Sequence, residues 1–227
     1  DLLATYHYNQ YIIAVTHLIT LGGITTIIMG AMYQLVPVAV GVPLHSERLA
    51  RRQFVFHWIG LIGMVWMFWV WNLKQVGHFG SVMGLSIGLF VYNLSRTLAR
   101  TSKWDVVACA IVSALCWLSV TMLAGLYLAA SKCWTFSPFA TISAMHAHAH
   151  LGGMGFFLML IVGVSYRLIP MFALSQLQSP RRAWISVILL NAGLAGLFVT
   201  MLLSSPWKLA FALLVIFALA AFGGEII

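Results

Sequence analysis

Long apolar stretches alternate with short polar ones along the whole chain. Seven of them can be delimited, at about 8–36, 53–72, 79–98, 105–130, 137–170, 184–204 and 208–227. Each is near or above the roughly 20 residues that an α-helix needs to cross the hydrocarbon core of a bilayer. Lipid offers the backbone no hydrogen-bonding partner, so segments of this kind must be helical. The pattern therefore predicts an all-α protein, a polytopic bundle of about seven transmembrane helices.

The composition agrees with this prediction and excludes other classes of protein. Of the 227 residues, 62% are hydrophobic and only 7% are charged, whereas a soluble domain has about 25% charged residues. Charges this sparse exclude a soluble enzyme, a disordered tail and a nucleic-acid-binding domain, despite the net charge of +8. The three cysteines, Cys109, Cys116 and Cys133, form no CxxC motif and are expected to be packing thiols.

The positive charges are sorted between alternate loops. Three loops carry nine Lys and Arg residues: Arg48, Arg51, Arg52, Arg96, Arg100, Lys103, Arg167, Arg181 and Arg182. The loops on the opposite side carry only Lys74, Lys132 and Lys208. Because loops rich in Lys and Arg remain on the cytoplasmic side, we expect the chain to begin outside and its odd-numbered segments to run inward. The inner arginines are expected to set this topology and to contact lipid headgroups.

No linker divides the chain, so residues 1–227 are predicted to form one bundle. A weak internal repeat relates about 8–72 to about 141–204, with the constant offset that places His17 on His150. Other identical pairs at this offset include Gly22/Gly155, Gly30/Gly163, Tyr33/Tyr166, Leu35/Leu168 and Pro37/Pro170. A general likeness of apolar helices that end in Pro is the alternative explanation. If the repeat is real, two helices of the same direction each carry a His at the same depth and could face one another across a ligand.

Histidines inside the predicted membrane segments are candidates for function, because ionisable side chains are expensive there. His17 lies about nine residues, or roughly 13 Å, below the outer end of the first segment. His146, His148 and His150 lie at a comparable depth in the fifth segment. His146 and His150 share a helix face and could hold a small metal ion. His148 points to the other side of the helix.

Haem is the ligand that best suits a pair of histidines at matched depth. Its iron binds two axial imidazoles from opposite sides, and its apolar macrocycle is stable between membrane helices. Gly22 and Gly155 lie close to the two histidines and would let a flat ring approach the backbone. Small residues also serve plain helix packing, so the glycines alone do not decide between the two roles.

The residues around these histidines resemble a known family. The sequence HAHLGGMGFFLMLIVGVSYRLIP, from His148 to Pro170, resembles the tenth transmembrane helix of haem-copper oxidase subunit I. In that family the first His of a His-x-His pair binds the high-spin haem and the second binds the low-spin haem. The segment from Tyr8 to Leu44 is similar to the family's second helix, which supplies the other low-spin ligand. The resemblance implies one low-spin haem b with His17 and His150 as its axial ligands.

The chain also departs from the family. The family's copper site needs a His on its sixth helix and a His-His pair on its seventh, and this sequence has no His-His pair, so copper is not expected. Nitric oxide reductase relatives use glutamates beside a second iron, but the only glutamates here are Glu47 and Glu225. His148 keeps the position of the high-spin ligand. Two interpretations stay open: a second haem on His148, or a haem-free His148 hydrogen-bonded within the bundle or to a partner chain.

Haem propionates are anionic and should lie toward the outer surface, given the depth of His17 and His150. Lys208 and Trp207, in the outer loop before the last segment, are the best-placed partners, because the family uses basic residues in the corresponding loop. A lysine that snorkels to the surface is the alternative.

The expected function is electron transfer through a bis-histidine haem in a subunit without its own oxygen-reducing site. Other subunits of a respiratory complex, a quinone or an outer-face cytochrome, and the lipid bilayer are the expected partners. An active oxygen or nitric oxide reductase with a second haem on His148, and a haem-free structural subunit, are the alternatives. The expected location is a prokaryotic cytoplasmic membrane or the mitochondrial inner membrane. The chain opens at Asp1 and stops at Ile227 inside an apolar run, so we expect both ends to be incomplete.

Overall fold

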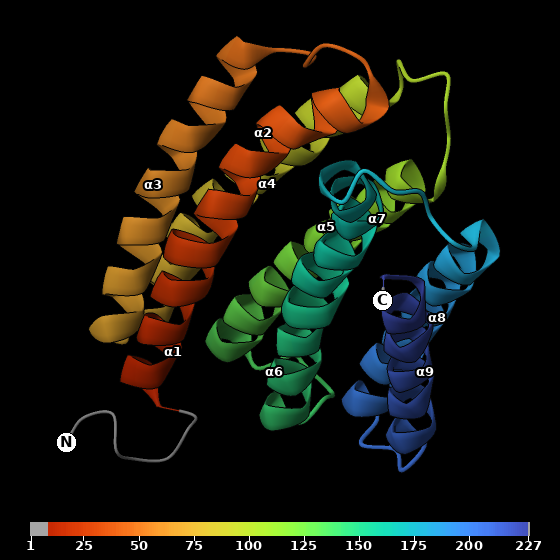
Figure 1. Cartoon of the computed structure of the whole chain (residues 1–227). Helices are drawn as coiled ribbons and strands as arrows, with labels where there is room; N and C mark the ends of the chain where they lie inside the picture. The colour runs from red at the N-terminus through yellow and green to blue at the C-terminus, as the bar shows by residue number, and fades with distance from the viewer. Residues whose placement is uncertain (1–8, 227) are drawn as a thin grey trace. The chain divides into compact units, whose positions relative to one another are not determined.

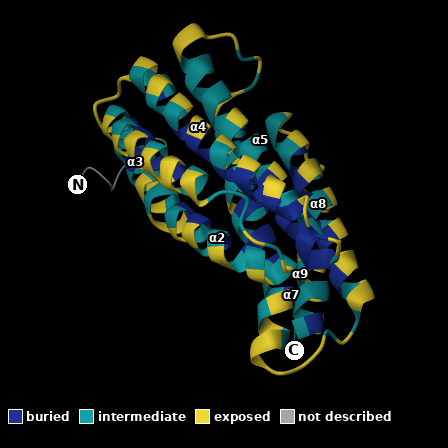
Figure 2. Ribbon diagram, turned by 90° about the horizontal axis from the view of Figure 1, so that it is seen from above, coloured by how far each residue is buried: buried dark blue, intermediate teal, exposed yellow. Residues whose placement is uncertain are grey.

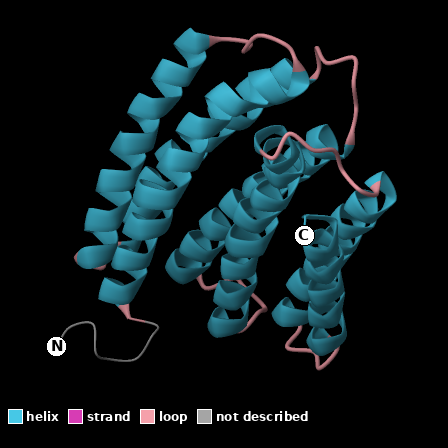
Figure 3. Ribbon diagram, viewed as in Figure 1, coloured by secondary structure: helices cyan, strands magenta, loops and turns pink. Residues whose placement is uncertain are grey.

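The computed structural model describes residues 9–226, and within them it contains helices and no strand (Figures 1 and 3). Tyr8 and Ile227, which bound the predicted first and last segments, lie outside the described residues. The elements are α1 (Gln10–His17), η1 (Leu18–Thr25), α2 (Thr26–Val40), α3 (Glu47–Trp69), α4 (Leu73–Leu98), α5 (Val106–Trp134), α6 (Thr141–His150), η2 (Leu151–Leu158), α7 (Met159–Phe172), α8 (Pro180–Leu202) and α9 (Lys208–Ile226). The prediction of an all-α protein is confirmed.

The elements join into seven continuous helical rods within the described residues, because α1, η1 and α2 follow one another without a break, as do α6, η2 and α7. Five rods are long and apolar enough to cross a membrane: Gln10–Val40, Val106–Trp134, Thr141–Phe172, Pro180–Leu202 and Lys208–Ile226. The other two, α3 and α4, have 23 and 26 residues. They fall short in hydropathy, since α3 begins with four charged residues in its first six and α4 carries polar side chains along its length. The structure thus supports a membrane protein with five such helices.

The described chain divides into two compact units. Unit 1 consists of the residues up to Arg100 together with Met122–Ser137, and unit 2 consists of Thr101–Thr121 and Pro138–Ile227. Helix α5 therefore contributes its first half to unit 2 and its second half to unit 1. His17 belongs to unit 1, and His150 belongs to unit 2.

Unit 1 is built around the antiparallel pair α3 and α4. The two backbones approach closely at Gly60, where a Cβ atom would lie 2.7 Å from the Met83 backbone nitrogen. One turn later the ring of Phe79 covers Gly63. Small residues are what such a close helix contact requires. One side of α3 is exposed, as its yellow positions in Figure 2 show. Ile59 and Ile62 of this helix are exposed large apolar residues.

Unit 2 repeats this arrangement with α8 and α9. Val215 packs over Gly193, where a Cβ atom would lie 2.8 Å from it, and the ring of Phe211 covers Gly196. The first half of α5 packs on the rod of α6, η2 and α7, because Ala110 lies directly against Gly163. The Trp117 indole nitrogen donates a 2.9 Å hydrogen bond to Asn191 Oδ1, which ties α5 to α8.

The offset that aligns His17 with His150 also relates the backbones of the two units. Helix α3 begins and ends at Glu47 and Trp69, and α8 begins and ends at the two positions that this offset aligns with them. The same holds for η1 and η2. Ser46 caps the amide nitrogen of Leu49 at 3.2 Å, and its counterpart Ser179 caps that of Arg182 at 3.4 Å. The two units therefore share one backbone plan of a long bent rod followed by a helical hairpin.

Candidate functional site

His17 lies at the junction between α1 and the π-helix η1. Its Nδ1 atom lies 2.8 Å from the backbone carbonyl of Ile13, one turn earlier. Its ring also lies 4.8 Å from the ring of Phe68 on α3, at an interplanar angle of 31°. The side chain is half-buried, so two neighbours fix the direction of the imidazole before any ligand is present.

His150 has the same position in its helix and the same backbone contact in unit 2. It is the last residue of α6, and η2 begins directly after it. Its Nδ1 atom lies 2.8 Å from the backbone carbonyl of His146. The backbone angles at the two histidines are identical, with φ −68° and ψ −35° at each. The sequence predicted a matched depth for the two histidines, and in the structure each imidazole makes the same contact with its own helix.

These contacts determine which ring nitrogen of each His is available to a metal. A carbonyl oxygen can only accept, so Nδ1 carries the proton and Nε2 keeps its lone pair. Histidines that bind metals almost always donate their other ring N–H to a carbonyl, a carboxylate or water, which fixes the ring and raises its basicity. His17 and His150 thus have the tautomer that an axial ligand needs.

The π-helices that follow the two histidines are unusual in their length. Each has eight residues, Leu18–Thr25 and Leu151–Leu158, whereas π-helical turns are rare and are often found at functional sites. In a π-helix each amide bonds to the carbonyl five residues earlier instead of four. Some carbonyls at its ends are therefore left without a backbone donor and can accept from side chains. Thr26 Oγ1 donates to the Leu21 carbonyl at 2.9 Å, which meets this need in η1.

The glycines expected to border a haem lie against neighbouring helices. A Cβ atom at Gly22 would lie 3.1 Å from the side chain of Leu61, and one at Gly155 would lie 2.9 Å from Trp117 Cβ. Both positions therefore serve helix packing within their own units. Gly23 and Gly153 have open space where a side chain would project. Gly23 follows His17 by six residues, and Gly153 follows His150 by three.

The other two histidines of the fifth segment differ from each other. His146 is exposed and contributes its backbone carbonyl to the orientation of His150. His148 is half-buried on the other side of α6. Among residues 9–226, no three His, Cys, Asp or Glu side chains gather as a metal site. Haem iron needs only one imidazole on each face, so the two positions of interest remain His17 and His150.

Trp207 lies in the connection between α8 and α9, Lys208 is the first residue of α9, and both are exposed. The hydroxyls of Ser143 and Ser204 lie 2.8 Å apart, which ties the start of α6 to this connection. His150 follows Ser143 by seven residues, or roughly 10 Å along the helix. The connection before Lys208 thus lies at the end of unit 2 from which α6 leads to His150.

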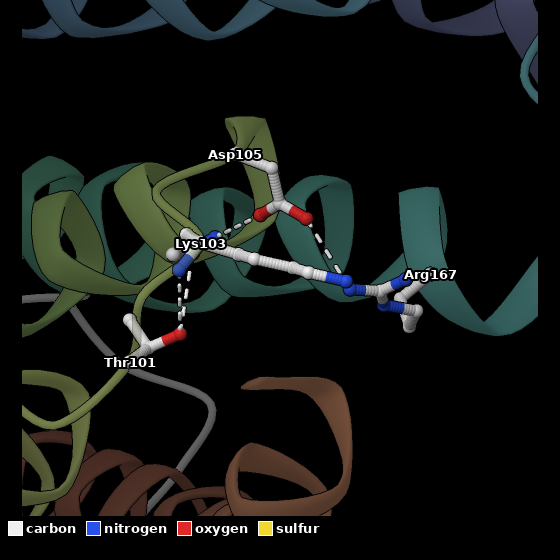
Figure 4. A network of polar contacts seen from close by, with 5 residues as sticks. Thr101, Lys103, Asp105 and Arg167 are labelled. Atoms are coloured by element: carbon white, nitrogen blue, oxygen red, sulfur yellow. Dashed lines mark hydrogen bonds and ion pairs between the residues drawn. The ribbon is translucent and has the colours of Figure 1, made fainter. Parts of the chain in front are cut away.

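At the opposite end of unit 2, the arginine that the sequence assigned to topology is paired. Arg167 Nη2 lies 3.2 Å from Asp105 Oδ2, and both side chains are 43% exposed (Figure 4). Asp105 Oδ1 also accepts a 3.0 Å hydrogen bond from the amide of Ala108 in the first turn of α5. The backbone amide of Lys103 donates to Thr101 Oγ1 at 3.2 Å, which shapes the turn before Asp105. This network joins α7 to the start of α5.

A cluster of buried polar side chains in unit 1 was not predicted from the sequence. Gln53, His57 and Ser86 are each at most 2% exposed. Gln53 Nε2 donates to Ser86 Oγ at 2.8 Å, and His57 Nε2 lies 3.1 Å from the Leu21 carbonyl. Polar residues spaced four apart on α3 are the only sequence signal, and they could equally have faced an aqueous surface.

The chain was compared with protein-family models and with curated proteins. Neither a family model nor a curated protein matches the chain. The functional interpretation therefore rests on the residues themselves.

Proposed function

We propose that this chain is a b-type cytochrome of an electron-transfer complex, in which His17 and His150 are the axial ligands of one low-spin haem. The observation that supports the proposal best is the shared environment of the two imidazoles. Each ends an α-helix, precedes an eight-residue π-helix and holds its Nδ1 atom 2.8 Å from the carbonyl four residues earlier. A histidine that serves only helix packing would not need to repeat these three features at the aligned position of the other unit.

The protein residues have separate tasks in this proposal. His17 and His150 would hold the haem through their Nε2 lone pairs, and the Ile13 and His146 carbonyls limit rotation of their rings. The open faces at Gly23 and Gly153 leave space for an apolar ring. When bound, haem supplies one-electron transfer, and two strong imidazole ligands favour the six-coordinate, low-spin state that this role requires.

Lys208, with Trp207 beside it, is proposed to neutralise a propionate near the outer face. A positive charge on this loop would favour the reduced form of the haem. The orientation rests on the sorted loop charges, since nine Lys and Arg residues lie on one side and three on the other.

We further propose that α3 and α4 cross the membrane with the five apolar rods. Their 23 and 26 residues span about 34 and 39 Å at 1.5 Å per residue, which exceeds the hydrocarbon core. Their polar side chains pair with one another inside unit 1, as Gln53 and Ser86 do. The proposed location is a prokaryotic cytoplasmic membrane or the mitochondrial inner membrane, where the chain would be a subunit that exchanges electrons with a quinone or an outer-face cytochrome.

The deciding experiment is a reduced-minus-oxidised optical spectrum of the purified protein, repeated with carbon monoxide, with haem and metal quantitation. We expect one haem b per chain, a sharp low-spin band and no carbon monoxide shift. A carbon monoxide-sensitive second haem would support a reductase with His148 as a ligand. Absence of haem would refute the proposal and leave a structural subunit.

Single substitutions make this test specific to residues. His17→Ala and His150→Ala should each abolish the low-spin band, because each removes one axial ligand. His146→Ala is the matched control, since it removes an exposed imidazole but keeps the carbonyl that orients His150. His148→Ala should also leave the band intact. Loss of the band only in the His148 variant would contradict the ligand assignment.

A further inference from the structure

Five exposed arginines lie at one end of the α3–α4 pair in unit 1. They are Arg48, Arg51, Arg52, Arg96 and Arg100. The connection before α3 holds the two helix ends together, because the Ser46 amide donates a 3.0 Å hydrogen bond to Asn93 Oδ1. The His45 amide donates a bond of the same length to Thr97 Oγ1. The start of α3 and the end of α4 therefore form one strongly positive surface.

Little negative charge offsets these arginines. Glu47 is the one acidic residue in the described part of unit 1. Its Oε2 atom lies 3.8 Å from Arg51 Nη1, and both side chains are so exposed that water screens the pair. Arg100 Nη2 lies 2.8 Å from His45 Nδ1. A guanidinium can only donate, so this imidazole accepts and is neutral. The surface therefore keeps a large excess of positive charge.

The corresponding end of unit 2 carries less unpaired charge. Its two carboxylates each pair with an arginine, at 3.2 and 3.3 Å. The offset of the repeat also places Trp184 and Ile185 on α8 where α3 has Arg51 and Arg52. Because the two units share one backbone plan, the fold does not require the additional arginines of unit 1. Their presence points to a role beyond folding.

An exposed apolar stripe on α3 follows the three arginines at its start. The stripe consists of Val55, Ile59, Ile62 and Trp66, and each side chain is between 49% and 64% exposed. Steps of three or four residues place the stripe on the same helix face as those arginines. Val55 and Trp66 are eleven residues apart, which is roughly 17 Å along a helix. One leaflet of the hydrocarbon core is about 15 Å thick, so the stripe is as long as one leaflet is deep.

We infer that this face of α3 binds an anionic phospholipid, with its phosphate among the arginines and an acyl chain along the stripe. Guanidinium groups match phosphate oxygens in geometry, and a basic cluster beside the cytoplasmic end of a membrane helix is typical of anionic-headgroup sites. An acidic protein segment would match the charges but not the stripe, and a zwitterionic lipid would match the stripe but not the charges. The inference rests on the proposed membrane crossing of α3 and does not depend on haem.

The test is native mass spectrometry of the purified full chain in detergent, titrated with dioleoyl-phosphatidylglycerol or dioleoyl-phosphatidylcholine. The two lipids have the same chains and differ in net charge. We expect the first anionic lipid to bind more tightly, with a preference that weakens as salt is added. Equal binding of the two lipids would overturn the inference and leave the arginines to an acidic segment of another subunit. Glycerophosphoglycerol, the headgroup without chains, should not compete, and competition by it would contradict the part assigned to the stripe.

Two arginines aligned by the repeat provide a matched comparison. Arg48 is the second residue of α3, Arg181 is the second residue of α8, and both are exposed. Arg48→Gln should weaken binding of the anionic lipid about fivefold, which corresponds to about 1 kcal/mol for one basic residue at an anionic surface. Arg181→Gln should weaken it less than about twofold. Equal effects of the two substitutions would refute a site on α3.

A further variant separates this inference from the proposed cytochrome. His17→Ala should lose haem and keep the preference for the anionic lipid, because His17 lies outside the basic surface and the stripe. A protein that prefers the anionic lipid but never contains haem would refute the cytochrome and leave the lipid site standing. A protein that contains haem but binds both lipids equally would refute the lipid site alone.

Discussion

The carboxylate of Glu225 permits a prediction whose size follows from the structure. This side chain of α9 is fully buried, and its Oε1 atom accepts a 2.7 Å hydrogen bond from the backbone amide of Ser179. Its Oε2 atom lies 3.3 Å from Arg182 Nε, and the Arg182 side chain is 43% exposed. Ser179 is the N-cap of α8, so the carboxylate also faces the positive end of that helix. We predict that Glu225→Gln, which keeps the shape and removes the charge, destabilises unit 2.

Three contributions set the magnitude. A hydrogen bond to a charged acceptor contributes about 1 kcal/mol more than one to a neutral acceptor. The half-exposed ion pair with Arg182 contributes at most about 1 kcal/mol because water screens it. The charge at the helix N-terminus contributes about 0.3–1 kcal/mol. An amide is easier to bury than a carboxylate, which offsets part of the loss, so the expected loss is about 2 kcal/mol.

Glu47 is the matched control for this prediction. It begins α3, the counterpart of α8, but its side chain is 82% exposed and its Oε2 atom lies 3.8 Å from Arg51. Glu47→Gln should therefore change the free energy of unfolding by less than about 0.5 kcal/mol. The assay is reversible denaturation in a mild detergent, combined with hydrogen exchange at the Ser179 amide. Equal effects of the two substitutions, or unchanged exchange at Ser179 in Glu225→Gln, would refute the reasoning.

Three further predictions concern packing, the haem and a buried hydrogen bond. Gly63→Leu should lower the free energy of unfolding by about 1–3 kcal/mol, because the ring of Phe79 on α4 occupies the space that the new side chain would need. Gly88→Leu should have little effect, because nothing lies within 4 Å of the position of its Cβ atom. Lys208→Gln should make the haem midpoint potential more negative in a potentiometric titration, because it removes a positive charge that favours the reduced form, and an unchanged potential would exclude Lys208 as a propionate partner. Asn191→Leu should cost about 1–3 kcal/mol in a denaturant titration, since it leaves the Trp117 indole without its acceptor.

Sequence patterns predicted the helical fold because lipid imposes one backbone solution on long apolar segments. They also singled out the two histidines and their offset. They could not reveal that α3 differs from the other rods, because all four charged residues at the start of α3 lie outside 53–72, the stretch that was delimited as apolar. Hydropathy alone does not show where a helix begins.

The site was harder to predict than the fold. The sequence Leu18–Thr25 contains no signal that predicts a π-helix. The Leu21 carbonyl within it is contacted by side chains outside this segment, the Thr26 hydroxyl and the His57 ring. The glycines near the histidines were a correct sign of close approach, but sequence could not tell a haem from a neighbouring helix. Gln53 on α3 and Ser86 on α4 are distant in sequence, and only folding makes them partners.

The two units agree in backbone even where they disagree in side chains. Gly41 ends α2 with φ +69°, and its counterpart Leu174 follows α7 with φ +50°, although it is a leucine. A left-handed conformation costs a residue with a side chain about 1–2 kcal/mol, and Leu174 is 95% exposed, so burial does not compensate. Trp71 and Ser204, another pair aligned by the repeat, share positive φ as well. A chain that keeps these turns at an energetic cost keeps the rods before them in register. Two titratable pairs lie in this register, Tyr33 with Tyr166 and His17 with His150. The two histidines also share the 2.8 Å contact of Nδ1 with the carbonyl four residues earlier, which makes them the matched pair of the two rods.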